Sequence, residues 1–235
     1  MANTTARRRK PPRPFVTANF ALTWDGRVTT RNYTPSDFSS RQDKRRLVEI
    51  RATTDAVLAG AGTIAADNMT MGIPADLSEA RVAEGRAPYP LRVLMTNSGQ
   101  VAPELKVFHK PLSPIHIFTT TRMPAETQEA LRGKATLHLA ASEQVDLAAM
   151  MTVLRREHDV RRLVCEGGPQ VFRALLAADL IDELHVTFCP RIFGGEKTPT
   201  LTGIAGEFLP SSLSLALRQM EVVDGECFLR YRIQR

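Results

Sequence analysis

The sequence predicts one α/β domain built around a mixed, mostly parallel β-sheet. Short apolar runs alternate with amphipathic segments through the first 180 residues, as in βαβ units. The last fifty residues hold extended segments with no helix between them, and the pair Asp224-Gly225 joins the final two as an antiparallel hairpin. A chain of 235 residues with no internal repeat or shift in composition suits a single large domain.

The first predicted strand covers residues 14–28 and breaks at the turn pair Asp25-Gly26. An amphipathic helix is expected over residues 39–54, because Ser39 or Ser40 can cap it and charged residues fill one side. Its apolar face carries Leu47, Ile50 and Thr54.

Residues 55–64 form a continuous apolar run that ends in Gly60 and Gly62, typical of a parallel strand covered on both faces. Residues 72–90 are rich in Ala, Gly, Pro and charged residues, so we expect an exposed connection or insertion there. Further strands are predicted at 91–97, 115–120, 135–140 and 161–168, and helices at 124–132, 147–158 and 169–180. The extended C-terminal segments are 182–195, 212–223 and 226–234.

The positive charge of the chain is concentrated at its N-terminus. The net charge is +6, but five positive charges lie within residues 1–13, so the remaining residues carry only about +1. We therefore expect residues 1–13 to be a disordered basic tail and 14–235 to be the folded domain. The folded part lacks a basic stripe with interleaved aromatic residues, which disfavours a nucleic-acid partner.

No apolar run approaches the roughly 20 residues needed to cross a membrane, and no secretory signal follows the basic N-terminus. These features favour a cytoplasmic protein without a membrane partner. The cysteines Cys165, Cys189 and Cys227 are far apart and lie in apolar runs, where buried thiols are common. The five histidines show no zinc-binding spacing, so no metal site is predicted.

Two glycine-rich turns end predicted core strands, at residues 59–63 and 165–169. Glycine lets backbone N–H groups approach a phosphate, and the following helix N-terminus adds partial positive charge. Neither turn matches the dinucleotide or P-loop fingerprint, so ordinary strand-to-helix turns are an equal alternative. Glu166 is more informative, because a carboxylate at the end of a core strand is costly unless it is paired or used at a site.

Three ordered stretches together resemble the reductase domain of riboflavin biosynthesis: "NFALTWDGRV", "IRATTDAVLAGAGTIAADN" and "LVCEGGPQVFRALLAADLIDELHVTFCPRIFGG". That domain is the C-terminal half of the bacterial bifunctional deaminase-reductase and also occurs as free-standing archaeal and fungal-type reductases. The resemblance runs from about Arg13 to the C-terminus, without the zinc-binding deaminase motifs. It implies a stand-alone reductase with a three-layer, dihydrofolate reductase-like fold.

The resemblance implies NADPH as hydride donor and a ribosylamino-pyrimidine 5′-phosphate as substrate, reduced at ribose C1′ to a ribityl chain. Polar assistance to the imine nitrogen would come from Asp25 and Glu166, the predicted catalytic residues. Substrate contacts would come from Arg51, Met71 and Glu166, and the family also implies a homodimer. The implied cofactor site comprises Leu22, Thr63, Asp67, Asn97, Gly168, Pro169, Gln170, Val171, Phe172, Arg173 and Ala174.

The chain departs from the family pattern in two places. Asn19 replaces a lysine common in bacterial members, and Pro74 stands where family members usually have an arginine that assists the phosphate. The basic residues Arg41, Lys44 and Arg45 either substitute for it or form a solvated helix face.

Three alternatives to this reductase stay open at the level of sequence. The first is an NADPH reductase of another small molecule, such as a pterin. The second is a non-catalytic nucleotide-binding protein, and the third is a nucleic-acid binder that uses the basic tail. If the chain is this reductase, its sequence is compatible with either the diamino or the amino-oxo pyrimidine as substrate.

Overall fold

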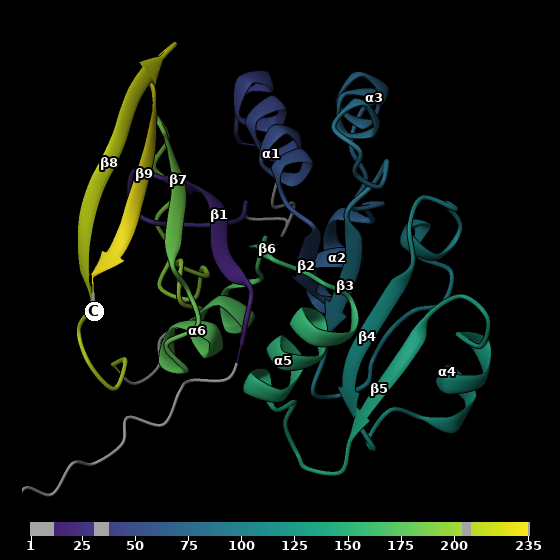
Figure 1. The fold of residues 1–235 in the computed structure, drawn as a ribbon. Coiled ribbons are helices and arrows are strands. Elements are labelled where there is room, and N and C mark those ends of the chain that lie inside the picture. Colours follow the sequence, from purple (N-terminus) through teal and green to yellow (C-terminus); the bar gives the residue numbers. More distant parts are fainter. Residues whose placement is uncertain (1–11, 31–37, 204–207, 235) are drawn as a thin grey trace, which may run out of the picture.

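A computed structural model describes residues 12–30, 38–203 and 208–234, which form a layered α/β structure (Figure 1). In the described residues one sheet runs in the order β5-β4-β3-β2-β6-β1-β7-β9-β8. Its strands are β1 (Phe15–Thr23), β2 (Ala56–Gly60), β3 (Leu91–Met95), β4 (Ile115–Thr120), β5 (Thr136–Ala140), β6 (Arg162–Cys165), β7 (Glu183–Cys189), β8 (Ser214–Val223) and β9 (Glu226–Gln234). The helices are α1 (Arg41–Thr53), α2 (Ala61–Asp67), α3 (Ala75–Ala83), the 3-10 turn η1 (Lys106–Phe108), α4 (Ala125–Ala130), α5 (Leu147–Glu157) and α6 (Pro169–Ala177).

The strand directions confirm the predicted mixed sheet. The strands β1 to β7 all pair in parallel, whereas β9 pairs antiparallel with both β7 and β8. Asp224 and Gly225 link β8 to β9 and both have positive φ, as a tight two-residue hairpin requires. Parallel pairing brings the carboxyl ends of β1, β2 and β6 to one edge of the sheet.

Hydrophobic cores lie on both faces of this sheet. On one face Val16 and Ala18 of β1 are buried against α5 and α6, where Phe172 packs at 4.8 Å from the Phe20 ring. On the other face Val57 of β2 joins Ile64 of α2 and several residues of β3 and β4. Every residue of β2 is buried, which explains its uninterrupted apolar sequence.

Polar contacts fix helix α1 at its N-terminus. Ser40, rather than Ser39, is the cap, since its side chain accepts a hydrogen bond from the Asp43 backbone N–H. The backbone N–H and the hydroxyl of Ser40 in turn donate to the Glu226 carboxylate at 2.9 and 2.5 Å. The start of α1 is therefore tied to the first residue of β9.

The structure corrects two predicted boundaries. The strand predicted over 55–64 ends at Gly60, because helix α2 starts at the next residue. The exposed connection predicted over 72–90 contains helix α3, and its buried residue Arg81 donates to the carbonyl oxygens of Ala52 and Thr54 at 2.7 Å. This helix was missed because a buried arginine, rather than an apolar stripe, attaches it to the end of α1.

The N-terminal prediction is also corrected in part. Residues 1–11 lie outside the described residues, but Arg13, which was assigned to the tail, forms a two-pronged ion pair with Asp182 at 2.7 and 2.8 Å. No helix among the described residues is long and apolar enough to span a membrane. Cys165 and Cys189 are buried free thiols, whereas Cys227 is only half-buried.

Candidate active site

A cavity of about 270 Å³ opens at the carboxyl edge of the sheet, between β1, α1, α2 and the start of α6. Ligands of open α/β sheets bind at this kind of edge. Six residues predicted to serve a site line the cavity: Arg51, Thr63, Asp67, Glu166, Gly168 and Pro169. The remaining lining residues include Asn19, Phe20, Ser39, Asp43, Lys44, Leu47, Met69 and Pro199.

The two glycine turns lie next to each other at this cavity. Strand β2 pairs with β6, and the Gly60 N–H donates to the Gly167 carbonyl oxygen at 2.7 Å. Gly167 has a φ of +94°, and a Cβ atom on it would lie 3.0 Å from the Phe20 ring. A Cβ on Gly168 would lie 2.7 Å from the Thr63 hydroxyl oxygen. The positive φ requires glycine at position 167, and a side chain at position 168 would displace the Thr63 hydroxyl; the peptide bond between the two glycines is cis.

Glu166 is paired, as its position at the end of a core strand requires. Its two carboxylate oxygens accept from Arg51 Nε and Nη2 at 2.6 and 2.7 Å, and both side chains are buried. Arg51 also donates to the Gly72 carbonyl at 2.8 Å and to the Met69 sulfur at 3.4 Å. Burial lowers the pKa of Arg51, but the charge and hydrogen bonds of Glu166 outweigh it and raise that pKa.

Helix α1 supplies a cavity residue, Asp43, that the sequence analysis did not predict as a site residue. Asp43 and Arg51 are its two buried residues, and with Leu47 they occupy every fourth position of one face. Burial raises the pKa of Asp43, despite hydrogen bonds from Thr187 and Ser39 that lower it. The signal available in the sequence was the series Asp43, Leu47 and Arg51, which lie four residues apart in turn and therefore share one helix face.

Lys44 is the residue of the basic group Arg41, Lys44 and Arg45 that lines the cavity. Arg45 instead pairs with Glu49 and Asp76, both at 2.8 Å, and those pairs are exposed. Pro74 is exposed and forms the N-cap of α3. The basic group therefore divides into one cation at the cavity and a solvated face.

Asp25 lies in the turn after β1 and does not line the cavity. Its carboxylate accepts from the Thr23 hydroxyl at 2.6 Å and from the backbone N–H groups of Gly194 and Phe193 at 2.7 and 3.2 Å. Burial raises its pKa, but these hydrogen bonds outweigh that effect and lower the pKa to about 2. The contacts favour a role in holding the loop after β7, and the catalytic role stays a prediction.

The other predicted cofactor and substrate residues lie around the cavity rather than on it. Leu22, Val171 and Phe172 are buried in the core, and Met71 is fully buried in the core on the opposite face. Asn97 accepts from the Val145 N–H through its side-chain oxygen at 3.0 Å. The first turns of α6 carry Gln170, Arg173 and Ala174, of which Gln170 is exposed.

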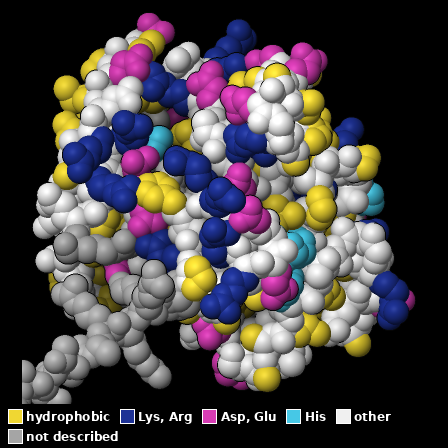
Figure 2. Space-filling view, viewed as in Figure 1, with side chains coloured by type: hydrophobic (Ala, Val, Ile, Leu, Met, Phe, Trp, Pro, Cys, Tyr) yellow, Lys and Arg dark blue, Asp and Glu magenta, His cyan; other side chains and the backbone are white. Residues whose placement is uncertain are grey.

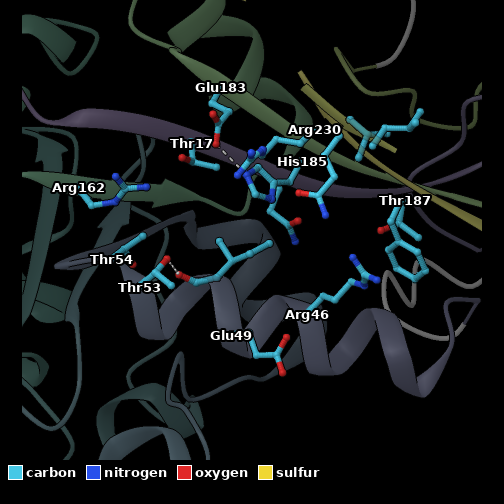
Figure 3. Close-up of a pocket in the computed structure, with 16 residues that line it drawn as sticks. Thr17, Arg46, Glu49, Thr53, Thr54, Arg162, Glu183, His185, Thr187 and Arg230 are labelled. Atoms are coloured by element: carbon cyan, nitrogen blue, oxygen red, sulfur yellow. Dashed lines mark hydrogen bonds and ion pairs between the residues drawn. The ribbon is translucent and has the colours of Figure 1, made fainter. Parts of the chain in front are cut away.

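A second cavity, of about 330 Å³, lies between α1 and the sheet (Figure 3). Arg46 of α1 points toward the strands opposite, from which His185 and Arg230 come, and Glu49 lies farther from those strands (Figure 3). Asn19 lines both cavities. Figure 2 shows Lys and Arg side chains across the middle of this face, interspersed with Asp and Glu. We assign the candidate active site to the first cavity, because the carboxyl ends of the strands meet there.

Comparisons with known proteins all place the chain in one family. Residues 14–227 match the model described as the RibD C-terminal domain. A protein named 2,5-diamino-6-ribosylamino-4(3H)-pyrimidinone 5′-phosphate reductase from Methanothermobacter thermautotrophicus is 28% identical over 225 residues, which cover 94% of this chain and 99% of that protein. Its namesake from Archaeoglobus fulgidus is 29% identical over 190 residues, covering 80% and 86%.

Solved structures agree with the fold. A pyrimidine reductase-like protein from Corynebacterium diphtheriae superposes with a TM-score of 0.80 at 23% identity, covering 94% of this chain and 92% of that one. The riboflavin biosynthesis reductase Rib7 of Saccharomyces cerevisiae gives a TM-score of 0.66 at 20% identity, covering 94% and 90%. At these identities the structural likeness supports the fold alone, and it confirms the predicted α/β class.

Proposed function

The chain belongs to the RibD C-terminal domain family, and on that premise we propose that it is an NADPH-dependent reductase of a ribosylamino-pyrimidine 5′-phosphate. The reaction converts the ribose of the substrate into a ribityl chain by reduction at C1′. The observation that carries the proposal is a single cavity that joins the glycine turns to the buried pair Arg51–Glu166. The turns fit a phosphate-bearing cofactor, and the pair fits a hydroxyl-rich substrate.

The start of α6 fits the pyrophosphate of NADPH. No side chain caps this helix at Gly168, so its first backbone N–H groups are not occupied by a capping oxygen. Gly168 has no side chain in a place where a Cβ would meet Thr63, so the backbone is bare on the cavity side. Gly168, Pro169 and Thr63 would hold the cofactor, which supplies a hydride when bound.

Glu166 is the residue best placed to orient the sugar. Both of its oxygens already accept from Arg51, which fixes the carboxylate plane, and it still lines the cavity. A carboxylate oxygen has further acceptor capacity for a substrate hydroxyl or amine. Arg51 then acts as a positioning residue, since its two hydrogen bonds hold Glu166 in place at the cavity wall. Lys44 provides the cation for the substrate phosphate in place of the missing arginine.

Asp43 is the candidate proton donor. It lines the same cavity, and burial raises its pKa toward the range where a carboxyl group keeps its proton. A protonated Asp43 Oδ could donate to the nitrogen or oxygen that is freed when the ribose ring opens. The reaction needs one proton in addition to the hydride, and this group can hold it out of bulk water.

We include a homodimer in the proposal. The exposed apolar residues of β8 are Leu215, Leu217, Met220 and Val222. A long apolar edge strand of this kind is normally covered, and we propose a second copy of this chain as its cover. A biosynthetic reductase that uses NADPH also suits the cytoplasm, which we take as its location.

The proposal is tested by following NADPH oxidation with four substrates in parallel. These are the diamino and the amino-oxo ribosylaminopyrimidine 5′-phosphates, the diamino compound without its phosphate, and dihydrofolate. We expect turnover with one or both phosphates, weaker turnover without the phosphate, and none with dihydrofolate. Glu166→Gln should lower kcat/KM, whereas the control Glu49→Gln, at an exposed residue of α1 that does not line the active-site cavity, should not.

Each contrary outcome points to one rival. Turnover restricted to dihydrofolate would establish a pterin reductase. Binding of NADPH in a calorimeter without oxidation by any pyrimidine would establish a non-catalytic nucleotide-binding protein. Full kcat/KM in Glu166→Gln would leave the reductase standing but remove the role given to Glu166.

A further inference from the structure

Three of the five histidines come together at the β5 edge of the sheet, although no sequence motif connects them. His116 lies in β4 and His138 in the neighbouring strand β5, while His158 is the residue that ends α5. His116 pairs in register with Thr136, and Phe118 pairs with His138. His116 and His138 therefore project from the same face of the sheet, and α5 places His158 over it.

The ring nitrogens converge on one point. His116 Nδ1 and His138 Nε2 are 3.0 Å apart, and the ligand nitrogens of all three residues lie within 4.8 Å of one another. Two imidazole nitrogens bound to one tetrahedral Zn²⁺ ion are separated by about 3.3 Å, given Zn–N bonds of about 2.0–2.1 Å. The closest pair is already near that separation, and a small rotation of the half-buried His158 ring would bring in the third.

Ring contacts hold the His116 and His138 side chains close to this arrangement. The His138 ring stacks on Phe118 with centroids 4.2 Å apart, and the His158 ring meets His116 edge-on at 4.2 Å. His116 is buried, whereas His138 and His158 are half-buried, so an ion could enter from solvent. Rigid imidazoles from three different elements form a more pre-organised donor set than histidines on a loop.

The surroundings of the three rings suit a cation. His116 Nδ1 and His138 Nε2 share one proton in their hydrogen bond, so on metal binding this proton moves to the other nitrogen of its ring and leaves both facing nitrogens bare. The carbonyl end of α5 and the nearby Glu157 favour positive charge at this position.

We propose that His116, His138 and His158 form a binding site for a divalent transition-metal ion of the zinc class, with water completing the coordination. In the bound state each ring presents a bare nitrogen to the ion and keeps its N–H on the other nitrogen, so no net proton is released. The ion would join the edge strand β5 to β4 and to the end of α5. None of the three histidines lines the active-site cavity, so the site is separate from the reductase chemistry.

The test is a titration of untagged, metal-free full-length protein with Co²⁺ and Zn²⁺. We expect one ion per chain, a ligand-field spectrum for Co²⁺ with nitrogen ligands, and a rise in Tm of about 5–10 °C at a hundredfold excess over Kd. His138→Gln should weaken binding by at least about tenfold. The matched control His109→Gln changes an exposed histidine outside the cluster and should bind like the wild type.

Absence of saturable binding to the wild type would overturn the proposal. Equal binding by His138→Gln and the wild type would also overturn it, since the ion would then sit elsewhere. Thermal unfolding of the metal-free variant shows whether His138→Gln is folded. If it is not, His158→Gln at the half-buried end of α5 provides the same comparison. NADPH oxidation by either folded variant should match the wild type, which separates this result from the proposed function.

Discussion

Replacing Glu166 by Gln removes one charge from the buried pair at the centre of the active site. Arg51 is 6% exposed, so its guanidinium would stay buried with only the Gly72 carbonyl, the Met69 sulfur and a neutral amide as close partners. Breaking a buried ion pair from one side costs about 3–5 kcal/mol. Gln keeps one acceptor oxygen, and Asp67 also attracts Arg51, so we expect a loss near the lower limit, about 3 kcal/mol.

The assay is thermal or urea unfolding at neutral pH, with the ion pair Arg45–Glu49 as control. That pair has a 2.8 Å contact but side chains that are 41% and 47% exposed, so Glu49→Gln should change stability by less than about 0.5 kcal/mol. For a chain of this length, Glu166→Gln should lower Tm by about 6–12 °C. If both variants lose the same small amount of unfolding free energy, burial does not strengthen the contribution of the Arg51–Glu166 pair to stability. The reasoning would then be wrong.

A double variant identifies the cause of the loss. Arg51→Met combined with Glu166→Leu leaves no unpaired buried charge and roughly preserves side-chain volume. We expect it to be more stable than Glu166→Gln, because apolar replacements of a buried pair are often neutral. A double variant that is less stable than the single one would show that the hydrogen bonds, rather than the orphaned charge, carry the effect.

Four further substitutions test the cavity residues Lys44 and Asp43, the turn residue Asp25 and the edge strand β8. Lys44→Gln should raise KM for the phosphorylated substrate about tenfold, the worth of one charge-assisted hydrogen bond, while Arg41→Gln changes it little. If Asp43 is the proton donor, wild-type activity should decline as pH rises through the raised pKa of Asp43, and Asp43→Asn should lower kcat and remove that decline. The pKa of Asp25 is lowered from 3.8 to about 2, so its contribution to stability is complete above pH 3.8 and is lost as the pH falls toward 2. In urea unfolding, Asp25→Asn should therefore destabilise the protein at pH 7 and do so much less near pH 2. Met220→Glu on β8 should shift sedimentation from dimer to monomer, and an unchanged mass would exclude this strand as the interface.

The parts of the fold that the sequence could predict are those set by apolar pattern and turn chemistry. Strand β2 was recognisable because all five of its residues are buried, and the β8–β9 hairpin because Asp224-Gly225 adopts the positive φ angles of a tight turn. Helix α3 was missed because the residue that docks it is Arg81, whose buried guanidinium binds three carbonyl groups instead of an apolar surface. Patterns of apolar residues carry no information about such contacts.

The candidate site, like the fold, could be predicted from the sequence only in part. Gly168 and Glu166 could be selected because a bare backbone and a carboxylate at a strand end are unusual in themselves. The approach of Arg51 to Glu166 joins residues 115 positions apart and depends on the pairing of β2 with β6. The three histidines near β5 are a second case, because only the register of β4 with β5 and the end point of α5 bring them together.

Helix α1 shows why the cavity itself could not be read from the sequence. A helix that covers a hydrophobic core has an apolar inner face, so Leu47 was expected to point inward and the charges outward. Here the inner face meets a ligand cavity, and the buried residues are Asp43 and Arg51 instead. Polar contacts hold the helix at both ends. At the N-terminus Ser40 donates to the Glu226 carboxylate, and at the C-terminus Arg81 donates to the carbonyl oxygens of Ala52 and Thr54. Because those anchors replace apolar packing, the face toward the sheet can keep charged groups for a substrate, at the cost of looking like a solvent face in the sequence.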